Sequence, residues 1–339
     1  MKALVCTHGG RASAPREALH APLAEFVALR DLDPPRPKGG QVVIEVELAA
    51  VNPSDDMFAR GLYGLPREKG APPGFEGVGR VVETGGGLVA RTMRGKRVAF
   101  FAQGSGSWAE RALTGAASCI PVGDALRAED AAGFLVNPFT AWALDELVAE
   151  RGAKSFVMSA AGSQMGKFLV SLAAERGRRP ICTVRRDEQI EPLRALGAAH
   201  VLNEETDGFD REMRDVLEAE RPSVFLDAVA GPRQARIHER MGEGARWVVY
   251  GRLASEPPAL ERIEQLIFQR KRIEGFWLSD WFGSASLVAK ARASRAIRRR
   301  FATGQWRTDV AATVRLDEGP ERLEAALRES RDGKVFLKP

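Results

Sequence analysis

Two different patterns of hydrophobic and polar residues divide the chain. Up to residue 127, short runs rich in β-branched residues alternate with glycines and prolines, as at 41–48, 79–84 and 97–101. Such runs predict short β-strands joined by turns and irregular loops. Residues 129–150 are instead rich in Ala and Leu and predict two short helices. We therefore expect a β-rich domain that comes first in the chain.

The middle of the chain alternates between apolar runs, which predict buried strands, and stretches with helical periodicity. The predicted strands are 155–160, 180–184, 201–202, 224–228 and 246–251, and the predicted helices include 166–176 and 188–196. Strands that alternate with helices are typical of a doubly wound parallel sheet. After residue 282 the pattern is helical and basic, and a strand-like run at 335–337 follows it.

The length of the chain agrees with more than one domain. Its 339 residues exceed the usual size of a single compact core. We expect the run at 335–337 to return to the first domain. The prediction is an α/β protein with a β-rich domain formed by 1–127 and 282–339 and an inserted Rossmann domain at 128–281.

Composition indicates a globular protein that works in a reducing compartment. Hydrophobic residues make up 44% and charged residues 28%, which is ordinary for such proteins. The chain has no run of about 20 apolar residues and no apolar signal core at its start, so we expect a cytoplasmic protein. The three cysteines form no CxxC pair and are expected to be buried and inert. The four histidines are expected at the surface or in loops.

The net charge of +5 raises the question of an anionic partner. The densest basic run, Arg298 to Arg300, follows a helical pattern, and acidic residues are interspersed along the chain. We interpret this run as a solvated helix face and expect no nucleic-acid partner. An anionic small ligand explains a modest positive balance equally well.

A turn between a predicted strand and a predicted helix, residues 160–166, is the candidate phosphate-binding loop. Backbone N–H groups at a helix N-terminus favour a pyrophosphate. The glycine pattern is incomplete, because Ala161 and Ser163 stand where G-x-G-x-x-G has its first two glycines, and only Gly166 remains. An ordinary βα turn that binds nothing is the alternative.

The end of the next strand adds to this hypothesis. An NAD enzyme usually has Asp or Glu about 20 residues beyond the loop, where it binds the ribose 2′-hydroxyl. This chain has Arg185 and Arg186 there, and guanidinium groups pair with a 2′-phosphate. We predict NADPH rather than NADH as the cofactor. Two solvated arginines at a strand end are the alternative.

Six segments carry a resemblance that covers nearly the whole chain: Asn52–Asp55, Gly61–Gly64, Gly74–Gly79, Asn137–Trp142, Tyr250–Gly251 and Phe276–Trp281. Together they resemble the zinc-independent medium-chain dehydrogenase/reductase superfamily. Within it, the mitochondrial-type 2-enoyl thioester reductases are most similar, and quinone reductases share the architecture. The resemblance implies a GroES-like fold for the β-rich domain.

The same segments predict that no zinc is bound. Zinc-dependent members of the superfamily have a His before the Glu of their G-H-E segment, where this chain has Phe75. The stretch from Asn52 to Asp55 stands where those members have an early Cys ligand. A zinc site needs three or four N, S or O ligands, and a phenylalanine supplies none.

The resemblance also implies a reaction and a catalytic residue. Reduction of an activated C=C bond needs no metal, whereas oxidation of an alcohol at neutral pH is difficult without one. Negative charge then develops on the carbonyl oxygen of an α,β-unsaturated substrate, where the protein must supply a hydrogen-bond donor. The resemblance implies that Tyr63 is this donor. Its alternative is a loop aromatic packed on the domain surface.

The remaining site residues are likewise implied by the resemblance. Gln164, Met165 and Arg252 depart from the residues that the family usually has at these positions. Lys334 matches a position that reaches back to the cofactor, and Asn52 and Trp281 are predicted to contact the substrate. The other predicted cofactor contacts are Asn137 and Thr140 at the nicotinamide or its ribose, Gly162, Ser163, Gln164 and Met165 at the pyrophosphate, Arg185 and Arg186 at the 2′-phosphate, and Tyr250, Gly251, Arg252, Leu253, Phe276, Trp277 and Leu278 around the nicotinamide half.

Three functions compete at this point. The first is NADPH-dependent reduction of an enoyl-CoA or enoyl-ACP, and the second is reduction of a quinone or another enone. The third is a protein that binds NADPH or RNA without catalysis. The fold alone does not decide among them. The resemblance implies a homodimer, a small-molecule substrate and no membrane partner.

Overall fold

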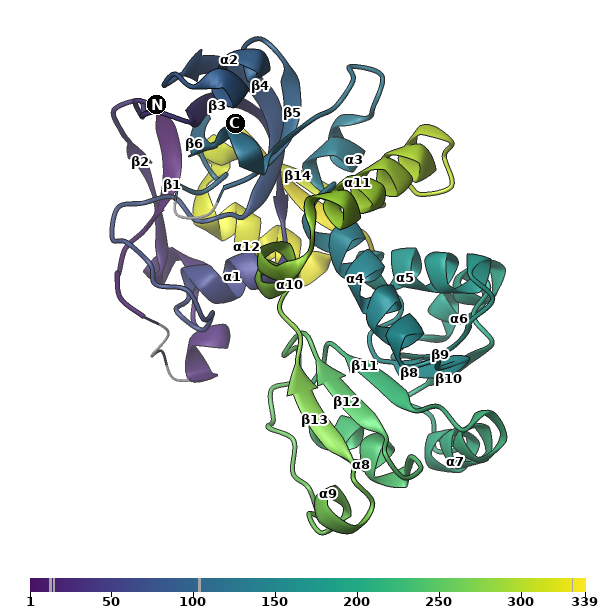
Figure 1. Cartoon of the computed structure of the whole chain (residues 1–339). Coiled ribbons are helices and arrows are strands. Elements are labelled where there is room, and N and C mark those ends of the chain that lie inside the picture. The colour runs from purple at the N-terminus through teal and green to yellow at the C-terminus, as the bar shows by residue number, and fades with distance from the viewer. Residues whose placement is uncertain (12–13, 15, 103–104, 331) are drawn as a thin grey trace. The chain divides into compact units, whose positions relative to one another are not determined.

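The computed structural model describes residues 1–11, 14, 16–102, 105–330 and 332–339. The chain divides into two compact units. The first unit consists of Met1–Val136 and Ile297–Pro339, and the second unit of Asn137–Ala296. The second unit is therefore an insertion into the first (Figure 1).

The boundaries between the two units differ from the predicted ones. They fall at 136/137 and 296/297, whereas the pattern predicted 127/128 and 281/282. The helix α3, Ala128–Ala132, packs on strands of the first unit, so these residues stay with that unit. The later part of α11, Leu287–Ala302, also belongs to the first unit, where the ring of Phe301 lies 5.7 Å from that of Phe134.

The first unit is built around a seven-stranded sheet. The order is β14-β15-β3-β4-β5-β7, and β6 pairs with β3. A separate antiparallel pair is formed by β1 and β2. The elements are β1 (Lys2–Cys6), β2 (Val27–Asp31), β3 (Gln41–Val51), α1 (Pro53–Ala59), β4 (Glu76–Thr84), α2 (Leu88–Met93), β5 (Arg97–Phe101), β6 (Arg111–Gly115), β7 (Cys119–Pro121), α3, β14 (Val310–Arg315), α12 (Gly319–Glu329) and β15 (Lys334–Lys338). Short 3-10 helices cover Arg16–Leu19, Leu23–Glu25, Ala116–Ser118 and Leu316–Glu318 in this unit and Asp187–Gln189 in the second unit.

The predicted return of the last strand to the first domain is confirmed. Val335, Phe336 and Leu337 of β15 pair antiparallel with Val51, Ala50 and Ala49 of β3. The strand β14 was not predicted, since a helical pattern was expected throughout this part of the chain. Most of its side chains are exposed, so it lacks the apolar run of a core strand and is held by parallel pairing with β15.

The second unit is a Rossmann-type parallel sheet with the order β10-β9-β8-β11-β12-β13. The chain starts at β8, moves outward to β10, and returns to build β11 to β13 on the other side. The carboxyl ends of β8 and β11 therefore form the switch point at which such sheets bind ligands. The elements are α4 (Val136–Glu150), β8 (Ser155–Met158), α5 (Gln164–Glu175), β9 (Arg179–Val184), α6 (Ile190–Ala195), β10 (His200–Asn203), α7 (Phe209–Glu220), β11 (Val224–Asp227), α8 (Pro232–Arg240), β12 (Arg246–Val249), α9 (Gln265–Phe268), β13 (Arg272–Gly275), α10 (Leu278–Ser284) and α11.

Burial confirms one expectation about isolated residues and corrects two. The three cysteines are buried, and burial raises the pKa of the Cys6 and Cys119 thiols to about 11 and 12. His238, expected at the surface, is 1% exposed within α8, where its ring packs near Trp247. Arg300, expected on a solvated face, is 3% exposed because it lies on the inner side of α11.

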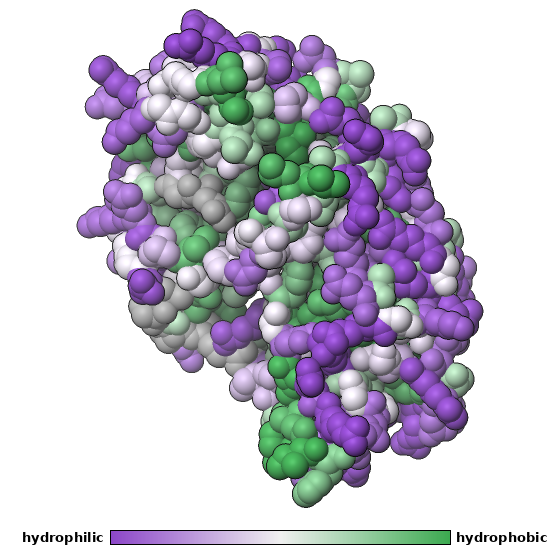
Figure 2. All heavy atoms as spheres, in the orientation of Figure 1, coloured by the Kyte–Doolittle hydropathy of each residue, from purple (hydrophilic) through white to green (hydrophobic). Residues whose placement is uncertain are grey.

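One edge of the second unit exposes apolar side chains. Ile267 and Phe268 of α9 are 71% and 77% exposed, and Ile273 of the edge strand β13 is 42% exposed. Figure 2 shows apolar side chains, in green, at the end of this unit where α9 lies. Within the described residues, no helix is both long enough and apolar enough to cross a membrane.

Candidate active site

The turn between β8 and α5 has the geometry of a phosphate-binding loop. The Ser163 hydroxyl accepts a hydrogen bond from the Gly166 N–H at 3.1 Å and so caps the helix. A Cβ on Gly166 would lie 2.3 Å from the Ala161 carbonyl oxygen, so only glycine fits there. Gly166 thus supplies the close contact of helix and strand that the third glycine of the fingerprint provides. The single glycine that the sequence retains is the one required by packing.

The first residues of α5 can therefore bind an anion. Amides in the first turn of a helix have no acceptor within the helix, and the helix dipole favours negative charge beside them. These residues are Gln164 and Met165. Ala160, just before them, has a φ of 50°, so the chain makes the tight turn with a non-glycine residue.

The carboxyl end of β9 carries the predicted pair of basic residues. Arg185 is exposed and Arg186 is half-buried, and both directly follow the strand that neighbours β8. The adjacent carboxylate of Asp187 accepts a hydrogen bond from the Asn203 side chain at 2.7 Å. Two arginines therefore follow the end of β9, the strand next to β8 and its candidate phosphate-binding turn.

A buried carboxylate that the sequence analysis did not single out joins the ends of β8 and β11. Asp227 accepts hydrogen bonds from the Ser159 hydroxyl at 2.5 Å and the Trp247 indole at 2.8 Å. It also accepts from the amides of Val229 at 2.8 Å and Ala230 at 3.0 Å. Burial nevertheless raises its pKa. An Asp at the end of a buried strand was the signal that could have identified it.

Tyr250, which follows β12, has a polar group that protein atoms do not satisfy. Its amide donates to the Asp227 carbonyl at 2.8 Å, but its hydroxyl is buried with no hydrogen-bond partner among the described residues. Burial raises its pKa. An unsatisfied buried hydroxyl costs about 1–3 kcal/mol, which a ligand atom would recover. Together with the turn and the arginines, this hydroxyl fits a dinucleotide at the switch point.

The other residues of the second unit that were predicted to contact the cofactor lie in two places, in α4 and after the strands β12 and β13. Asn137 and Thr140 lie in the first turns of α4, where Thr140 is buried. The others follow β12 and β13. A Cβ on Gly251 would lie 2.8 Å from the Ala228 carbonyl oxygen, and Leu253 donates to that oxygen at 3.0 Å. The chain from Phe276 to Trp281 enters α10, where the Trp281 and Phe139 rings are 6.1 Å apart.

Tyr63, the predicted catalytic residue, belongs to an aromatic cluster in the first unit. Its ring lies 5.1 Å from that of Phe75, which also contacts Phe58 at 5.3 Å and Phe101 at 6.1 Å. Phe75 stands at the position where zinc-dependent members have histidine. Tyr63 therefore packs on the residue that was predicted to stand in place of a zinc-ligating histidine.

A second group in the first unit consists of four buried polar side chains, Asn52, Asp55, Glu76 and Lys334, which we call the buried quartet. Lys334 Nζ donates to Asn52 Oδ1 at 2.5 Å, and Asn52 Nδ2 donates to Glu76 Oε1 at 3.0 Å. The Asp55 carboxylate accepts hydrogen bonds from the backbone N–H of Asn52 at 2.6 Å and from the backbone N–H of Phe75 at 2.8 Å. Both polar atoms of the Asn52 side chain therefore have protein partners.

Burial dominates the electrostatics of the quartet. It raises the pKa of Asp55 to about 7 and raises the pKa of Glu76. It lowers the pKa of Lys334, which the two carboxylates partly offset. Glu76 Oε2 also accepts from the amides of Leu135 and Val136 at 3.0 and 2.9 Å. The sequence predicted ligand contacts for Lys334 and Asn52, and the structure shows that each has a partner inside the first unit.

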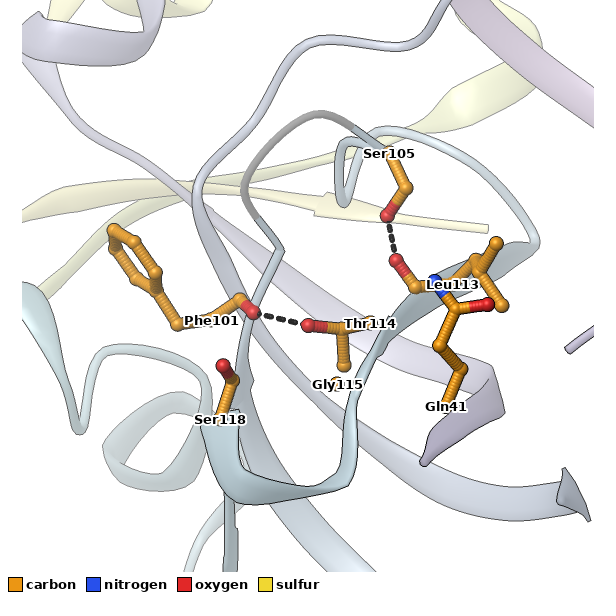
Figure 3. A pocket seen from close by; sticks show the side chains of 7 residues that line it. All are labelled: Gln41, Phe101, Ser105, Leu113, Thr114, Gly115 and Ser118. Carbon is orange, nitrogen blue, oxygen red and sulfur yellow. Dashed lines mark hydrogen bonds between the residues drawn. The ribbon is translucent and has the colours of Figure 1, made fainter. Parts of the chain in front are cut away.

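A separate pocket of about 410 Å³ lies in the first unit (Figure 3). Two hydrogen bonds cross it, from Thr114 to the Phe101 carbonyl at 2.7 Å and from Ser105 to the Leu113 carbonyl. None of its lining residues is charged, so these side chains supply neither an acid nor a base at neutral pH. The lining residues are Gln41, Phe101, Ser105, Leu113, Thr114, Gly115 and Ser118.

Family models match both units of the chain. Residues 38–124 match the alcohol dehydrogenase GroES-like domain, and residues 165–291 match the zinc-binding dehydrogenase domain. The mitochondrial enoyl-[acyl-carrier-protein] reductase of Bos taurus is 32% identical over 268 residues, which cover 77% of this chain and 71% of that protein. Within the described residues, no group of three or more His, Cys, Asp or Glu is arranged to hold a metal.

Solved structures extend the similarity to the whole chain. A putative NADPH:quinone reductase from Mesorhizobium loti is 44% identical, with a TM-score of 0.94 and coverage of 100% of this chain and 98% of that chain. The quinone oxidoreductase of Thermus thermophilus, also solved in complex with NADPH, is 25% identical, with a TM-score of 0.74 and full coverage of both chains.

Fold and similarity together define an oxidoreductase with a GroES-like unit and a Rossmann unit. The chain belongs to the medium-chain dehydrogenase/reductase superfamily. The fold class and the family resemblance predicted from the sequence are confirmed.

Proposed function

We propose that this protein uses NADPH, without zinc, to reduce the C=C bond of an α,β-unsaturated carbonyl compound, and that this compound is a 2-enoyl thioester. The observation that carries the proposal is Tyr63 packed on Phe75 at 5.1 Å, in a chain with relatives named enoyl reductases. Phe75 stands at the position of a zinc ligand in zinc-dependent members of the superfamily. It packs against Tyr63, whose phenol is a hydrogen-bond donor.

The roles of the residues follow from the charge that the reaction creates. NADPH, when bound, supplies the hydride that adds to the β-carbon of the substrate. The electron pair of the C=C bond then moves towards the carbonyl oxygen, and the α-carbon takes up a proton from water. The Tyr63 hydroxyl donates a hydrogen bond to that oxygen, which stabilises the developing negative charge. Gln164 and Met165 amides hold the pyrophosphate, and Arg185 and Arg186 hold the 2′-phosphate.

Tyr63→Phe tests the catalytic role directly. The loss of one transition-state hydrogen bond should lower kcat/KM for crotonyl-CoA at least about tenfold, while the Kd for NADPH stays unchanged. NADPH oxidation should be followed with crotonyl-CoA, a longer enoyl-CoA and 1,4-benzoquinone in parallel. A wild-type rate for the variant on every substrate would remove Tyr63 from the mechanism.

Arg185→Ala tests the choice of cofactor. The variant should raise the KM for NADPH and leave the KM for NADH unchanged, because only NADPH carries the 2′-phosphate. Equal KM values for NADPH and NADH in both the wild-type protein and the variant would refute the preference.

Quinone reduction is the second candidate, favoured by the 44% identity to the putative NADPH:quinone reductase. The same measurements separate the two functions. Faster turnover of 1,4-benzoquinone than of either enoyl thioester, with no effect of Tyr63→Phe, would favour the quinone. Metal analysis that found stoichiometric zinc would refute the zinc-free mechanism in either case.

A cytoplasmic homodimer paired through β13 is the assembly we propose. The strand is a sheet edge on which Ile273 is 42% exposed, and Ile267 and Phe268 of the preceding helix α9 are exposed as well. If two copies pair antiparallel about Ile273, Arg272 of each copy faces Glu274 of the other, so the charges match. Ile273→Lys should convert the dimer to a monomer in light scattering, and an unchanged mass would argue against this edge.

A further inference from the structure

The positive charge of the protein is concentrated in one stretch of sequence. Residues 281–308 contain seven basic residues and no Asp or Glu. The net charge of the whole chain is +5, so the rest of the chain has a net charge of −2. The stretch that determines the sign of the net charge contains the helix α11, Leu287–Ala302 (Figure 1).

The helix α11 has one buried side and one exposed side. Ala293, Ile297 and Phe301 are buried, so one side of α11 packs on the protein. On the opposite side, a rise of about 1.5 Å per residue spreads the outward positions from Val288 to Arg299 over roughly 16 Å. All these positions belong to one continuous helix, so its geometry sets their spacing. The exposed residues on this outer face are Leu287, Val288, Ala291, Arg292, Arg295, Arg298, Arg299 and Ala302.

The charges on this face are compensated only in part. Arg292 pairs with Glu146 at 2.7 Å, yet its side chain is still 66% exposed. Arg295 and Arg298 form no ion pair within the part of the chain that the structure describes. Like charges three and four residues apart destabilise a helix. The arrangement therefore costs stability, and an anionic partner would offset that cost.

The end of the face adds apolar surface. Leu287 and Val288 are 82% and 78% exposed at the start of α11. A small apolar contact next to a charged rim is the usual composition of a protein–protein interface. The outer face carries no aromatic side chain on which a nucleobase could stack. The chemistry of the face therefore favours an acidic protein over a nucleic acid.

We propose that the outer face of α11 docks an acidic acyl carrier protein that presents the enoyl thioester to the enzyme. The inference rests on the proposed function, because it identifies the carrier of that substrate. Acidic side chains of the carrier pair with Arg292, Arg295, Arg298 and Arg299, and its apolar side chains contact Leu287 and Val288. Complementary charge of this kind governs encounter and specificity.

A double charge reversal, Arg295→Glu with Arg298→Glu, tests the docking face. The KM for crotonyl-ACP should rise at least about tenfold at low ionic strength with little change in kcat, because the face repels the carrier. The KM for crotonyl-CoA and for crotonyl-N-acetylcysteamine should stay unchanged. A matched control is Arg211→Glu with Arg214→Glu, which reverses two exposed arginines at the same spacing on α7.

Three results would overturn the docking face. They are an unchanged KM for crotonyl-ACP, an equal rise in the control variant, and an equal rise for crotonyl-CoA, which would instead indicate a site for the CoA phosphates. If the wild-type protein turns over no enoyl thioester, the proposed function fails. Titration of the protein with crotonyl-ACP then still decides the docking face. Binding lost only in the α11 variant supports it, and absent or equal binding refutes it.

Discussion

The candidate phosphate-binding turn and the buried quartet satisfy polar groups in opposite ways. The turn is made by seven consecutive residues, 160–166, and the first amides of the helix that follows, at Gln164 and Met165, have no acceptor within that helix. The quartet brings the neighbouring Asn52 and Asp55 together with the more distant Glu76 and Lys334, and its groups bond to one another. The comparison teaches that a site built from neighbours in sequence needs one fitting residue, Gly166, whereas a site built from distant residues needs all its members at once.

The largest effect should come from removing the single positive charge of the quartet. Lys334→Met leaves two buried carboxylates without a cation and should lower the free energy of unfolding by about 3–5 kcal/mol. Urea denaturation measures this change. Lys338→Met, at the exposed end of the same strand, is the control and should change little. If Lys334→Met is as stable as the control, the quartet is not held together by charge.

A smaller effect is expected in the turn. Gly166→Ala places a methyl group against the Ala161 carbonyl, so the turn must shift. Overpacking of this kind costs about 1–3 kcal/mol, and the displaced amides should weaken NADPH binding by roughly tenfold. Fluorescence titration with NADPH measures the Kd. Gly242→Ala is the control, since a Cβ there meets no atom within 4 Å. Equal Kd values for the two variants would contradict the packing role of Gly166.

The smallest effect concerns pH. The pKa of Asp55 is raised to about 7 in the folded protein, above its ordinary value of 3.8, so the folded state binds this proton more tightly than the unfolded state. Its contribution to stability is therefore complete below about pH 4 and is lost as the pH rises towards 7. Asp55→Asn should flatten the fall in unfolding free energy between pH 5 and 7, by on the order of 1 kcal/mol.

The exposed Asp124 provides the control for this pH dependence. Asp124→Asn should keep the wild-type slope, since its side chain is 78% exposed. A wild-type slope in Asp55→Asn as well would show that other groups carry the pH dependence.

The sequence predicted features that depend on local order. Strands with apolar runs, the turn at 160–166 and the arginines after β9 were all found from neighbouring residues. The aromatic cluster around Tyr63 and the partners of Lys334 depend on which distant segments meet, and no local pattern encodes this. Asp227 was visible as an acid at a strand end, but its four hydrogen bonds come from three segments. The buried positions of His238 and Arg300 likewise follow from tertiary packing.

The pairing of β15 with β3 has a consequence for synthesis on the ribosome. The whole second unit emerges from the ribosome before β14 and β15. It can therefore complete its sheet while the sheet of the first unit still lacks these two strands at one edge. Lys334 is the first residue of β15 and is synthesised with it. Until then, Asp55 and Glu76 have no cation beside them, and the nascent first unit keeps them hydrated. The insertion is therefore expected to become resistant to protease during translation earlier than the residues that precede it.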